Sequence, residues 1–416
     1  MTARRVVITG LGIVGAYGNS VSLAFSGLLE GRSLVRNVEV ASEAGTLNFV
    51  GAPTSGEPWV GMPAPPIAMS DKVSLLALAA AESAISDANL DLDREDLSRA
   101  GVAVGTSLGA VMTQEAAYYE IIAENKSRLS PFTLVKVMQN GPAAQIALRY
   151  QLHGPSLTYS VTCSSSSVAV GESMRNIRHG YTDVMIAGGT EALFTYVSIR
   201  AWQALHVLAP PRLDNVAETC RPFSKDRNGT VLGDGAAFVV LEELERAKKR
   251  GAHIYAEIAG YGVCNDAAHI TQPSVDGQAR AMELALADAR VSPDAIDYIN
   301  AHGTGTQLND LTETRALRKL FGPHADKVAV SSTKSMHGHL IGAAGALEVI
   351  ICASAVMRQC VPPTAHLYDP DPQCDLDYVP HTGRDMRVRI AMSNSFAVGG
   401  TASVLIIRQL SKTLAI

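Results

Sequence analysis

Charged residues are scarce in this chain of 416 residues, and their balance does not favour binding to nucleic acid. Asp, Glu, Lys and Arg together make up 18% of the residues, and the formal net charge is −5. A basic surface drives binding to a phosphate backbone, so nucleic acid is not an expected partner. Aromatic residues are also few, at 5%, whereas 47% of the residues are hydrophobic and 35 are glycines. This composition favours tightly packed α/β layers over disorder or a coiled coil.

Long hydrophobic runs are missing as well. The N-terminal apolar stretch, residues 1–18, is interrupted by glycines, so it predicts a first strand rather than a secretory signal. The longest run of small apolar residues, 342–357, contains Glu348 and is too short to span a membrane. We therefore expect no association with a membrane.

The cysteines lack the spacing of a metal site or of a disulfide framework. They stand at positions 163, 220, 264, 352, 360 and 374, with no Cys-x-x-Cys pair. A soluble, reducing compartment is the default for this pattern, so we expect a cytoplasmic protein. His337 and His339 suggest zinc, but two histidines at this spacing with no third ligand nearby make a poor site. No metal is predicted.

Apolar segments of strand length alternate with helical patterns, which indicates an α/β fold. The predicted strands are Arg5–Thr9, Val102–Val104, Leu157–Val161, Val184–Ala187, Tyr255–Ala259, Ile296–Asn300, Val328–Ser331 and Val404–Ile407. The predicted connections are Ala52–Met69, Ala209–Asn215 and Val361–Met386.

Three short units recur in one order, which indicates an internal duplication. The matching segments are residues 105–107 and 303–305, 162–164 and 333–335, and 233–237 and 399–403. Each segment lies next to an apolar run: residues 233–237 lead into the apolar residues 238–240, and the others lie beside predicted strands. We expect two halves, at 1–252 and 253–410, followed by a tail at 411–416.

Cys163 lies at the turn between a predicted strand and a helix of small residues, 164–178. A thiol at a helix N-terminus is close to unpaired N–H groups and to the positive end of the helix dipole, and both favour the thiolate. The four serines at 164–167 could be low-complexity sequence, but the flanking strand and helix argue against a linker. The other five cysteines are expected to be buried structural residues.

His302 and His339 share one feature of placement with Cys163. All three follow the C-terminal end of a predicted strand, and sites in α/β folds collect at this edge of the sheet. A histidine taken alone is more often a core or surface group than a catalyst. The shared edge is therefore what makes the two histidines candidates for catalysis.

Residues 10–15, Gly-Leu-Gly-Ile-Val-Gly, match a dinucleotide-binding fingerprint after a strand. The next helix is predicted to begin only after Asn19, so no helix N-terminus adjoins these glycines. No clear acidic residue ends a second strand. Nucleotide binding is not expected.

Taken in order, these motifs resemble those of the β-ketoacyl–acyl-carrier-protein synthases that elongate chains in fatty-acid and polyketide synthesis. The resemblance extends from about residue 3 to residue 408. The matching segments are residues 8–12, Cys163 with its helix, 183–191, 221–223, 232–236, 300–306, 334–345 and 394–396. The resemblance implies a thiolase-type fold of five αβαβα layers, built from two duplicated halves and working as a dimer.

The resemblance also implies a decarboxylative Claisen condensation with no bound cofactor, because both substrates ride on the phosphopantetheine of an acyl carrier protein. Cys163 would accept the acyl chain, and His302 and His339 would stabilise the enolate formed when malonyl thioester loses carbon dioxide. Lys334 and Glu348 match a family pair that orients the site.

Further substrate contacts are implied in the same way. Thr304 and Thr306 would hold the pantetheine arm, and Phe396 and Val398 would contact the substrate. The backbone N–H groups of Cys163 and Val398 would form the oxyanion hole.

Three segments depart from the family pattern. The closing loop has Ala397-Val398-Gly399-Gly400 where Gly-Phe-Gly-Gly is usual, and His337 stands where a small polar residue is usual. The helix that often supplies cations for docking the carrier has only Lys72. Its apolar neighbours are either core or a contact surface: Val73, Leu75, Leu76 and Leu78.

Lys126, Arg128 and Arg200 are the remaining candidates for carrier docking. Together with the altered loop, the sparse docking helix weakly favours a specialised polyketide or polyene system over fatty-acid elongation. The partner would then be a homologous subunit of the chain-length-factor kind, and a homodimer is the main alternative.

Two other functions compete with condensation. One is a non-catalytic subunit of the chain-length-factor kind, but such subunits lack the cysteine that this chain has at position 163. The other is a biosynthetic thiolase, whose second catalytic cysteine would stand near Ser395 and Phe396.

Overall fold

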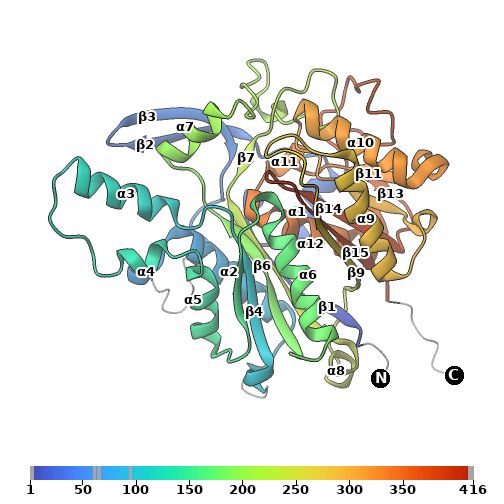
Figure 1. Cartoon of the computed structure of the whole chain (residues 1–416), viewed down its shortest axis with the longest axis horizontal. Helices are drawn as coiled ribbons and strands as arrows, with labels where there is room; N and C mark the ends of the chain where they lie inside the picture. Colours follow the sequence, from blue (N-terminus) through green and yellow to red (C-terminus); the bar gives the residue numbers. More distant parts are fainter. Residues whose placement is uncertain (1–3, 60–61, 63–66, 93–95, 411–416) are drawn as a thin grey trace.

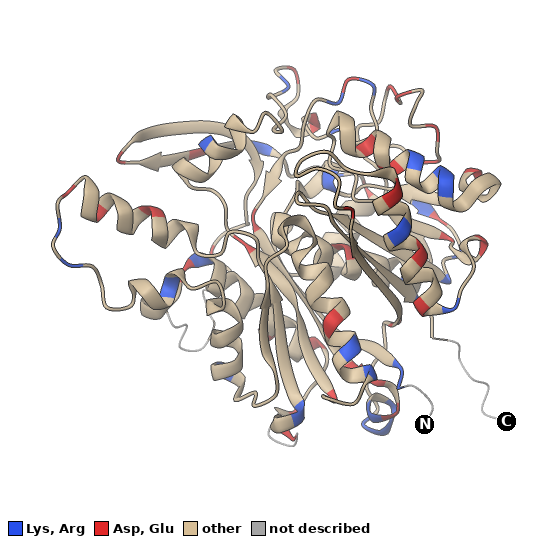
Figure 2. Ribbon diagram, in the orientation of Figure 1, with Lys and Arg blue, Asp and Glu red and all other residues tan. Residues whose placement is uncertain are grey.

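Strands and helices alternate along the chain, as the apolar pattern predicts (Figure 1). The computed structural model describes residues 4–59, 62, 67–92 and 96–410, so the predicted tail at 411–416 lies outside the described residues. Figure 2 shows most charged residues on the outer helices and loops, while the sheet at the centre is largely uncharged.

The first half of the chain contains β1 (Val6–Val14), α1 (Val21–Leu29), β2 (Arg36–Ser42), β3 (Gly45–Ala52), α2 (Lys72–Asp87), β4 (Ala100–Gly105), α3 (Val111–Ile122), α4 (Thr133–Val137), α5 (Gly141–Tyr150), β5 (Ser156–Tyr159), α6 (Ser165–Arg178), β6 (Val184–Glu191), α7 (Tyr196–Ala204), β7 (Leu232–Gly233), β8 (Gly235–Glu243) and α8 (Leu244–Lys249).

The second half contains β9 (Ala256–Asn265), α9 (Val275–Ala289), β10 (Tyr298–Asn300), α10 (Gln307–Phe321), β11 (Ala329–Ser331), α11 (Lys334–His337), α12 (Ala344–Arg358), β12 (Cys360–Val361), β13 (Arg384–Asp385), β14 (Ile390–Phe396) and β15 (Thr401–Arg408). Each of the predicted strands overlaps one of these elements. The strand predicted to reach Val161 ends earlier, at Tyr159. Seven strands were not predicted: β2, β3, β7, β8, β12, β13 and β14.

The sheet order shows that the two halves repeat one topology. Ten strands hydrogen-bond in the order β11-β10-β14-β15-β9-β1-β8-β6-β4-β5. Each half contributes five strands to this sheet. Numbered in chain order within its half, each set runs third, second, fourth, fifth, first from the sheet edge inward. The first strands, β1 and β9, pair antiparallel where the two sets meet. The duplication is therefore confirmed as a feature of the fold, while its boundary at residue 252 stays a prediction.

Two helices occupy the middle of the molecule. α6 and α12 contact each other, and each contacts strands of both halves. α2 packs on β1 and β8 with α5 beside it, and α9 packs on β9 and β15 with α10 beside it. The layers are thus helices, sheet, central helices, sheet and helices, which is the predicted five-layer αβαβα arrangement.

α12 and the turn before it form the one segment of the described residues with the length and apolarity of a membrane span. This segment, Ile341–Arg358, is 83% buried inside the protein. Its apolar side chains therefore serve the protein core.

The glycines of the apparent nucleotide fingerprint have a packing role. Gly10 and Gly12 lie within β1, where a Cβ atom would overlap backbone atoms of α2. Gly260 and Gly262 of β9 meet α9 in the same way. The next helix, α1, begins at Val21 after the N-cap Ser20, as expected. These glycines allow a helix to lie close to a strand.

This packing predicts that an alanine destabilises the protein at Gly12 but not at the nearby Gly15. Gly12→Ala places a methyl group against the Ala80 carbonyl oxygen and should lower the free energy of unfolding by about 3 kcal/mol. Gly15→Ala is the matched control, because the nearest atom to its new Cβ is 4.0 Å away, and its effect should stay within about 0.5 kcal/mol. Urea denaturation of both variants measures the difference, and equal stabilities would refute the packing role.

Candidate functional site

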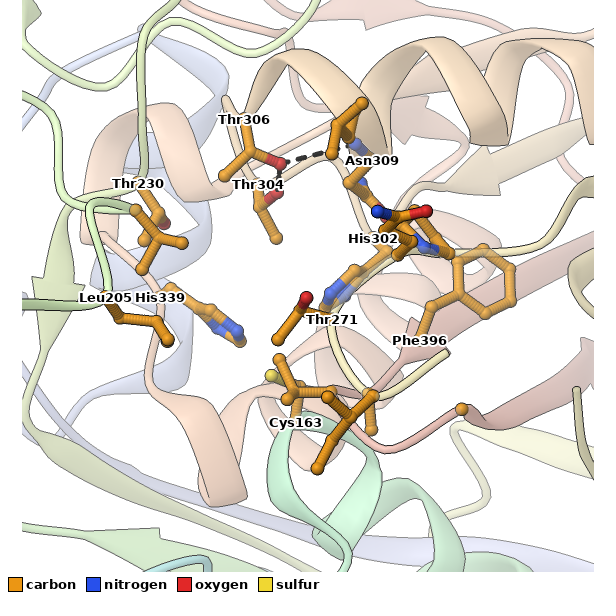
Figure 3. A pocket seen from close by; sticks show the side chains of 18 of the residues that line it. Cys163, Leu205, Thr230, Thr271, His302, Thr304, Thr306, Asn309, His339 and Phe396 are labelled. Carbon is orange, nitrogen blue, oxygen red and sulfur yellow. Dashed lines mark hydrogen bonds between the residues drawn. The ribbon is translucent and has the colours of Figure 1, made fainter. Parts of the chain in front are cut away.

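The three side chains predicted from strand ends meet in one buried place. One ligand-type atom each from Cys163, His302 and His339 lies within 4.8 Å of the others, and all three residues are buried. Cys163 comes from the first half of the chain and the histidines come from the second. Figure 3 shows the cysteine below the two imidazoles, at one side of an open cavity.

Cys163 sits in a tight turn that leads into α6. A single 3-10 turn, Thr162–Ser164, precedes the helix, and Thr162 has a positive φ of 48°. The second half has an equivalent turn, Ile341–Ala343, which leads into α12 and starts with a φ of 43° at Ile341. The structural counterpart of residues 162–164 is therefore 341–343. The predicted match to 333–335 was wrong, because those residues belong to a segment inserted before the turn.

The four serines after Cys163, residues 164–167, lie where the two halves of the chain contact each other. All four side chains are buried. Ser164 Oγ donates to the carbonyl of Ser395 at 2.9 Å, Ser166 Oγ accepts from the N–H of Ala346 at 2.9 Å, and the hydroxyls of Ser167 and Ser403 lie 2.7 Å apart. Short side chains with a hydroxyl let the backbones approach closely and still satisfy buried polar groups. The serine run is therefore structural rather than low-complexity sequence.

Burial opposes the thiolate that the helix N-terminus was expected to favour. Desolvation raises the pKa of Cys163 to about 11, although Lys334 and the backbone N–H groups of Val398 and Cys163 act in the opposite direction. Cys163 is therefore a thiol at neutral pH. The backbone N–H groups of Val398 and Cys163 lie close enough to the sulfur to lower its pKa.

The hydrogen bonds of His339 settle which of its ring nitrogens bears the proton. Its Nδ1 accepts the backbone N–H of Ile341 at 3.3 Å, so the proton of the neutral ring is on Nε2. That Nε2 is buried and has no hydrogen-bond partner within the described part of the chain. His339 therefore presents a free N–H donor inside the site.

His302 is fixed through its backbone. Its N–H donates to Glu313 Oε1 at 2.9 Å, and its carbonyl accepts from Lys334 Nζ at 2.6 Å. Its Nδ1 is buried without a partner among the described residues. Burial, followed by the charge of Lys334, lowers the pKa of His302 and of His339 well below the ordinary value of 6.5. Both imidazoles are neutral at neutral pH.

Lys334 and Glu348 form an ion pair in the interior beneath these histidines. Both side chains are completely or almost completely buried, and the Lys334 ammonium donates to Glu348 Oε1. Burial raises the pKa of Glu348 to about 7, against the opposing influence of Lys334. The pair positions His302 through its carbonyl and places a positive charge near the site.

Spacing alone would let Cys163, His302 and His339 hold a metal ion. The charge of Lys334 acts on all three groups and opposes a bound cation. The absence of a metal stays a prediction that this charge supports.

The cavity next to these residues has a volume of about 410 Å³. Thr304, Thr306, Phe396 and Val398 line it, and the hydroxyls of Thr304 and Thr306 lie 2.9 Å apart (Figure 3). Their contact with the substrate stays a prediction. Several other lining residues were not predicted from the sequence: Trp202, Leu205, Thr230, Asp266, His269, Thr271 and Asn309. Asp266, His269 and Thr271 follow the end of β9, so the strand-end rule that identified His302 could have found them.

His337 does not line this cavity. Its Nδ1 lies 2.7 Å from the carbonyl of Gly338 and must donate to it, and its Nε2 lies 3.0 Å from Thr333 Oγ1. Burial lowers the pKa of His337 to about 3, so the ring stays neutral. His337 is therefore a hydrogen-bonded core residue.

The helix around Lys72 is a core helix. The apolar residues beside Lys72 are buried, so the alternative that they form a contact surface is wrong. Lys72 Nζ itself pairs with the buried carboxylate of Asp234 at 2.7 Å, so much of its charge is already neutralised within the molecule. This pairing argues against Lys72 as a free docking cation.

The other docking candidates are exposed but dispersed. Lys126 and Arg128 lie in the loop after α3, where Lys126 pairs with Glu124 at 2.8 Å. Arg200 lies on α7, with its guanidinium 5.3 Å from the ring centre of Tyr196. None of the three lines the cavity, and their role in docking stays a prediction.

The buried ion pair predicts how stability responds to losing one partner. Lys334→Met leaves Glu348 unpaired and should cost about 3–5 kcal/mol, whereas Lys334→Met combined with Glu348→Leu should recover most of that loss. The penalty should shrink as the pH falls, because the folded pKa of Glu348 is raised and its neutral form can then be buried without a partner. Denaturation across pH measures this, and a penalty independent of pH would contradict it.

Comparison with known proteins places these features in a family. Residues 3–247 match the N-terminal domain of β-ketoacyl synthases, and residues 255–368 match their C-terminal domain. The chain is 42% identical over 406 residues to nodulation protein E of Rhizobium meliloti, covering 98% of this chain and 99% of the relative. It is 40% identical over 410 residues to 3-oxoacyl-[acyl-carrier-protein] synthase 2 of Coxiella burnetii, with the same coverage.

Among solved structures, the ishigamide ketosynthase/chain length factor superposes with a TM-score of 0.91 at 34% identity, covering 99% of this chain and 100% of that one. The family domains, the relatives and the superposition agree with the site geometry. This chain therefore belongs to the β-ketoacyl synthase family and is an acyltransferase of the ketosynthase type.

Proposed function

We propose that Cys163 accepts an acyl chain from an acyl carrier protein and that His302 and His339 then promote its condensation with malonyl carrier. The main support is the meeting of a thiol from one half with two neutral imidazoles from the other, within 4.8 Å of one another. The reaction releases carbon dioxide and gives a β-ketoacyl carrier.

In the first half-reaction, the sulfur of Cys163 attacks the carrier thioester. A new sulfur–carbon bond forms on Cys163, the bond to the carrier sulfur breaks, and the proton of the thiol leaves with the carrier thiol. The backbone N–H groups of Cys163 and Val398 act on the same sulfur, so they are placed to stabilise the oxyanion of this step.

In the second half-reaction, malonyl carrier loses carbon dioxide and leaves an enolate. The free Nε2–H of His339 can donate to the thioester oxygen where this charge develops. His302 faces the same space, 5.4 Å from His339 between ring centres. Both donors are neutral before the charge appears, and the nearby Lys334 adds a positive field. The enolate carbon then attacks the acyl group on Cys163.

The substrate arm fits the wall formed by Thr304 and Thr306. Figure 3 shows the two hydroxyls next to each other and to Asn309 at the cavity wall, and hydroxyl groups suit the amides of a phosphopantetheine chain. The substrates bring this group with them, so no further cofactor is proposed. The natural partner is an acyl carrier protein, and the name of the Coxiella relative includes such a carrier.

The two competing functions are less consistent with this site. A non-catalytic subunit has no use for a cysteine held against two buried histidines. A thiolase uses a second cysteine as base, whereas Cys163 is the only cysteine lining the cavity among the described residues. Condensation with decarboxylation is the better match.

We propose further that the chain works in the cytoplasm as a dimer, either with itself or with a homologous chain-length-factor-like subunit. β5 lies at one edge of the ten-stranded sheet, and Leu157 on it is 40% exposed. The arm formed by α3 and α4 projects from the body (Figure 1) and exposes apolar side chains, including Ile122 at 74% and Leu134 at 67%. An exposed edge with nearby apolar residues is typical of a partner interface.

The pathway is a weaker part of the proposal. The Val398 loop and the core character of α2 depart from the family pattern, and the superposed ishigamide structure is a ketosynthase with a chain length factor. We therefore favour a specialised polyketide or polyene system, with fatty-acid elongation as the alternative.

Assays of the separate half-reactions test the catalytic roles. Cys163→Ala should take up no acyl label from radiolabelled acyl carrier, because the thiol that attacks is missing. His302→Ala and His339→Ala should keep measurable acyl uptake but release carbon dioxide from malonyl carrier about 10²–10³ times more slowly. His253→Ala, an exposed histidine next to Tyr255, is the control and should match the wild type. Full label on Cys163→Ala or normal carbon dioxide release by both histidine variants would overturn these assignments.

Light scattering tests the interface. The wild-type protein should have the mass of a dimer, alone or after co-expression with a homologous subunit. Ile122→Glu should shift it to a monomer because a charge replaces an apolar contact. Leu213→Glu should have no effect, since Leu213 is 96% exposed and lies outside the arm. A dimer that tolerates Ile122→Glu would exclude the arm from the interface.

A further inference from the structure

The hydroxyl of Thr162, the residue before the nucleophile, makes a contact that crosses between the two halves. Thr162 Oγ1 donates to the backbone carbonyl of Val398 at 2.8 Å. Thr162 and Val398 are separated by 236 positions in the sequence, yet both adjoin Cys163. The bond thus links the nucleophile turn directly to the closing loop, residues 397–400.

The backbone at Thr162 is unusual for this residue type. Its φ of 48° lies in the left-handed region, which a β-branched side chain adopts rarely. Such a conformation persists only where the surrounding structure holds it. Here it directs the hydroxyl toward Val398 while Cys163 enters the helical turn.

Ser164, on the other side of the nucleophile, contacts the same loop. Its Oγ lies 2.9 Å from the carbonyl of Ser395 and 3.2 Å from that of Thr401, the residues that flank the loop. Ser164 is completely buried and therefore anchors the two ends. Thr162 is only partly buried and holds the loop near its tip.

The remaining bonds of the closing loop leave the Val398 carbonyl to Thr162. The N–H of Ala397 donates to Thr401 at 2.8 Å, and the N–H of Gly399 donates to Ile270 at 2.8 Å. The N–H of Gly400 donates to the Ala397 carbonyl at 3.1 Å, and the carbonyls of Gly399 and Gly400 accept from Asn265 and Asp266, each at 2.9 Å. None of these bonds involves the Val398 carbonyl. Thr162 and Ile270 therefore hold the peptide group between Val398 and Gly399, while Gly400 holds the preceding peptide group, which carries the Val398 N–H.

We propose that Thr162 is a positioning residue, which holds Val398 so that its N–H is aimed at the oxyanion of the acyl-transfer step before the substrate arrives. This inference rests on the proposed function, because it concerns the oxyanion hole of that reaction. It assigns to the Thr162 hydroxyl the task of completing the set of hydrogen bonds that preorganise this donor.

Three substitutions of Thr162 distinguish the effect of the hydroxyl from the effect of the side-chain shape. Thr162→Val keeps the β-branched shape and removes the donor, Thr162→Ala removes both, and Thr162→Ser keeps the donor. Acylation of Cys163 by acyl carrier, measured in a single turnover, should slow about tenfold in the Val and Ala variants, the size expected when one neutral hydrogen bond no longer holds a catalytic donor. The Ser variant should stay close to the wild-type rate.

The rate of malonyl-carrier decarboxylation serves as a second readout, because a general structural defect would lower it as well. It should be unaffected in all three variants, because His302 and His339 stabilise that charge. Thr219→Val is the matched control, since Thr219 makes a similar bond from its hydroxyl to the carbonyl of Val216 at 2.8 Å, away from the site. It should leave both rates unchanged.

The outcomes distinguish this inference from the proposed function. Wild-type acylation rates in both the Val and Ala variants, or a Ser variant as slow as the Val variant, would overturn the role of Thr162 alone. A wild-type protein that takes up no acyl group would overturn the proposed function and this inference with it. If the Val variant fails to fold, the Ala and Ser pair decides the question.

Discussion

The structure depends on the close approach of α6 and α12 at the centre of the molecule. A Cβ atom on Gly345 would lie 2.7 Å from the Cβ of Ser167, so only glycine allows this separation. Gly342 is as tightly placed, since a Cβ atom there would lie 2.5 Å from the buried Glu191 carboxylate of the first half. Because each helix begins beside the other, Cys163 at the start of α6 meets His339, which precedes α12, and His302, which follows β10. The meeting of Cys163, His302 and His339 is a product of this packing.

The same burial sets the protonation of the site. Desolvation keeps Cys163 as a thiol and both histidines neutral, while Lys334 and Glu348 are buried as a pair. The resting site therefore has donors and a nearby positive charge but no thiolate–imidazolium pair. Such a site is suited to stabilising negative charge that develops during the reaction, first on the acyl thioester and then on the malonyl thioester.

Much of this arrangement could be predicted from the sequence, and the failures have physical causes. Cys163, His302 and His339 were predicted because strand ends share one edge of a sheet. β14 was missed because it contains Ser393 and Asn394, polar residues that are buried in the structure and hide its strand pattern. The thiolate expectation failed because local helix geometry cannot reveal how completely tertiary packing would desolvate Cys163. The bond from Thr162 to Val398 joins distant segments and is visible only in three dimensions.

Mass spectrometry of the cysteine-containing peptides during turnover tests the central claim most directly. After incubation with acyl carrier, the acyl group should be found on the peptide that contains Cys163 and on none with the other five cysteines. After addition of malonyl carrier, it should disappear from Cys163 as a β-ketoacyl carrier two carbons longer accumulates. An acyl group on a different cysteine, or product formed without a Cys163 intermediate, would contradict the account.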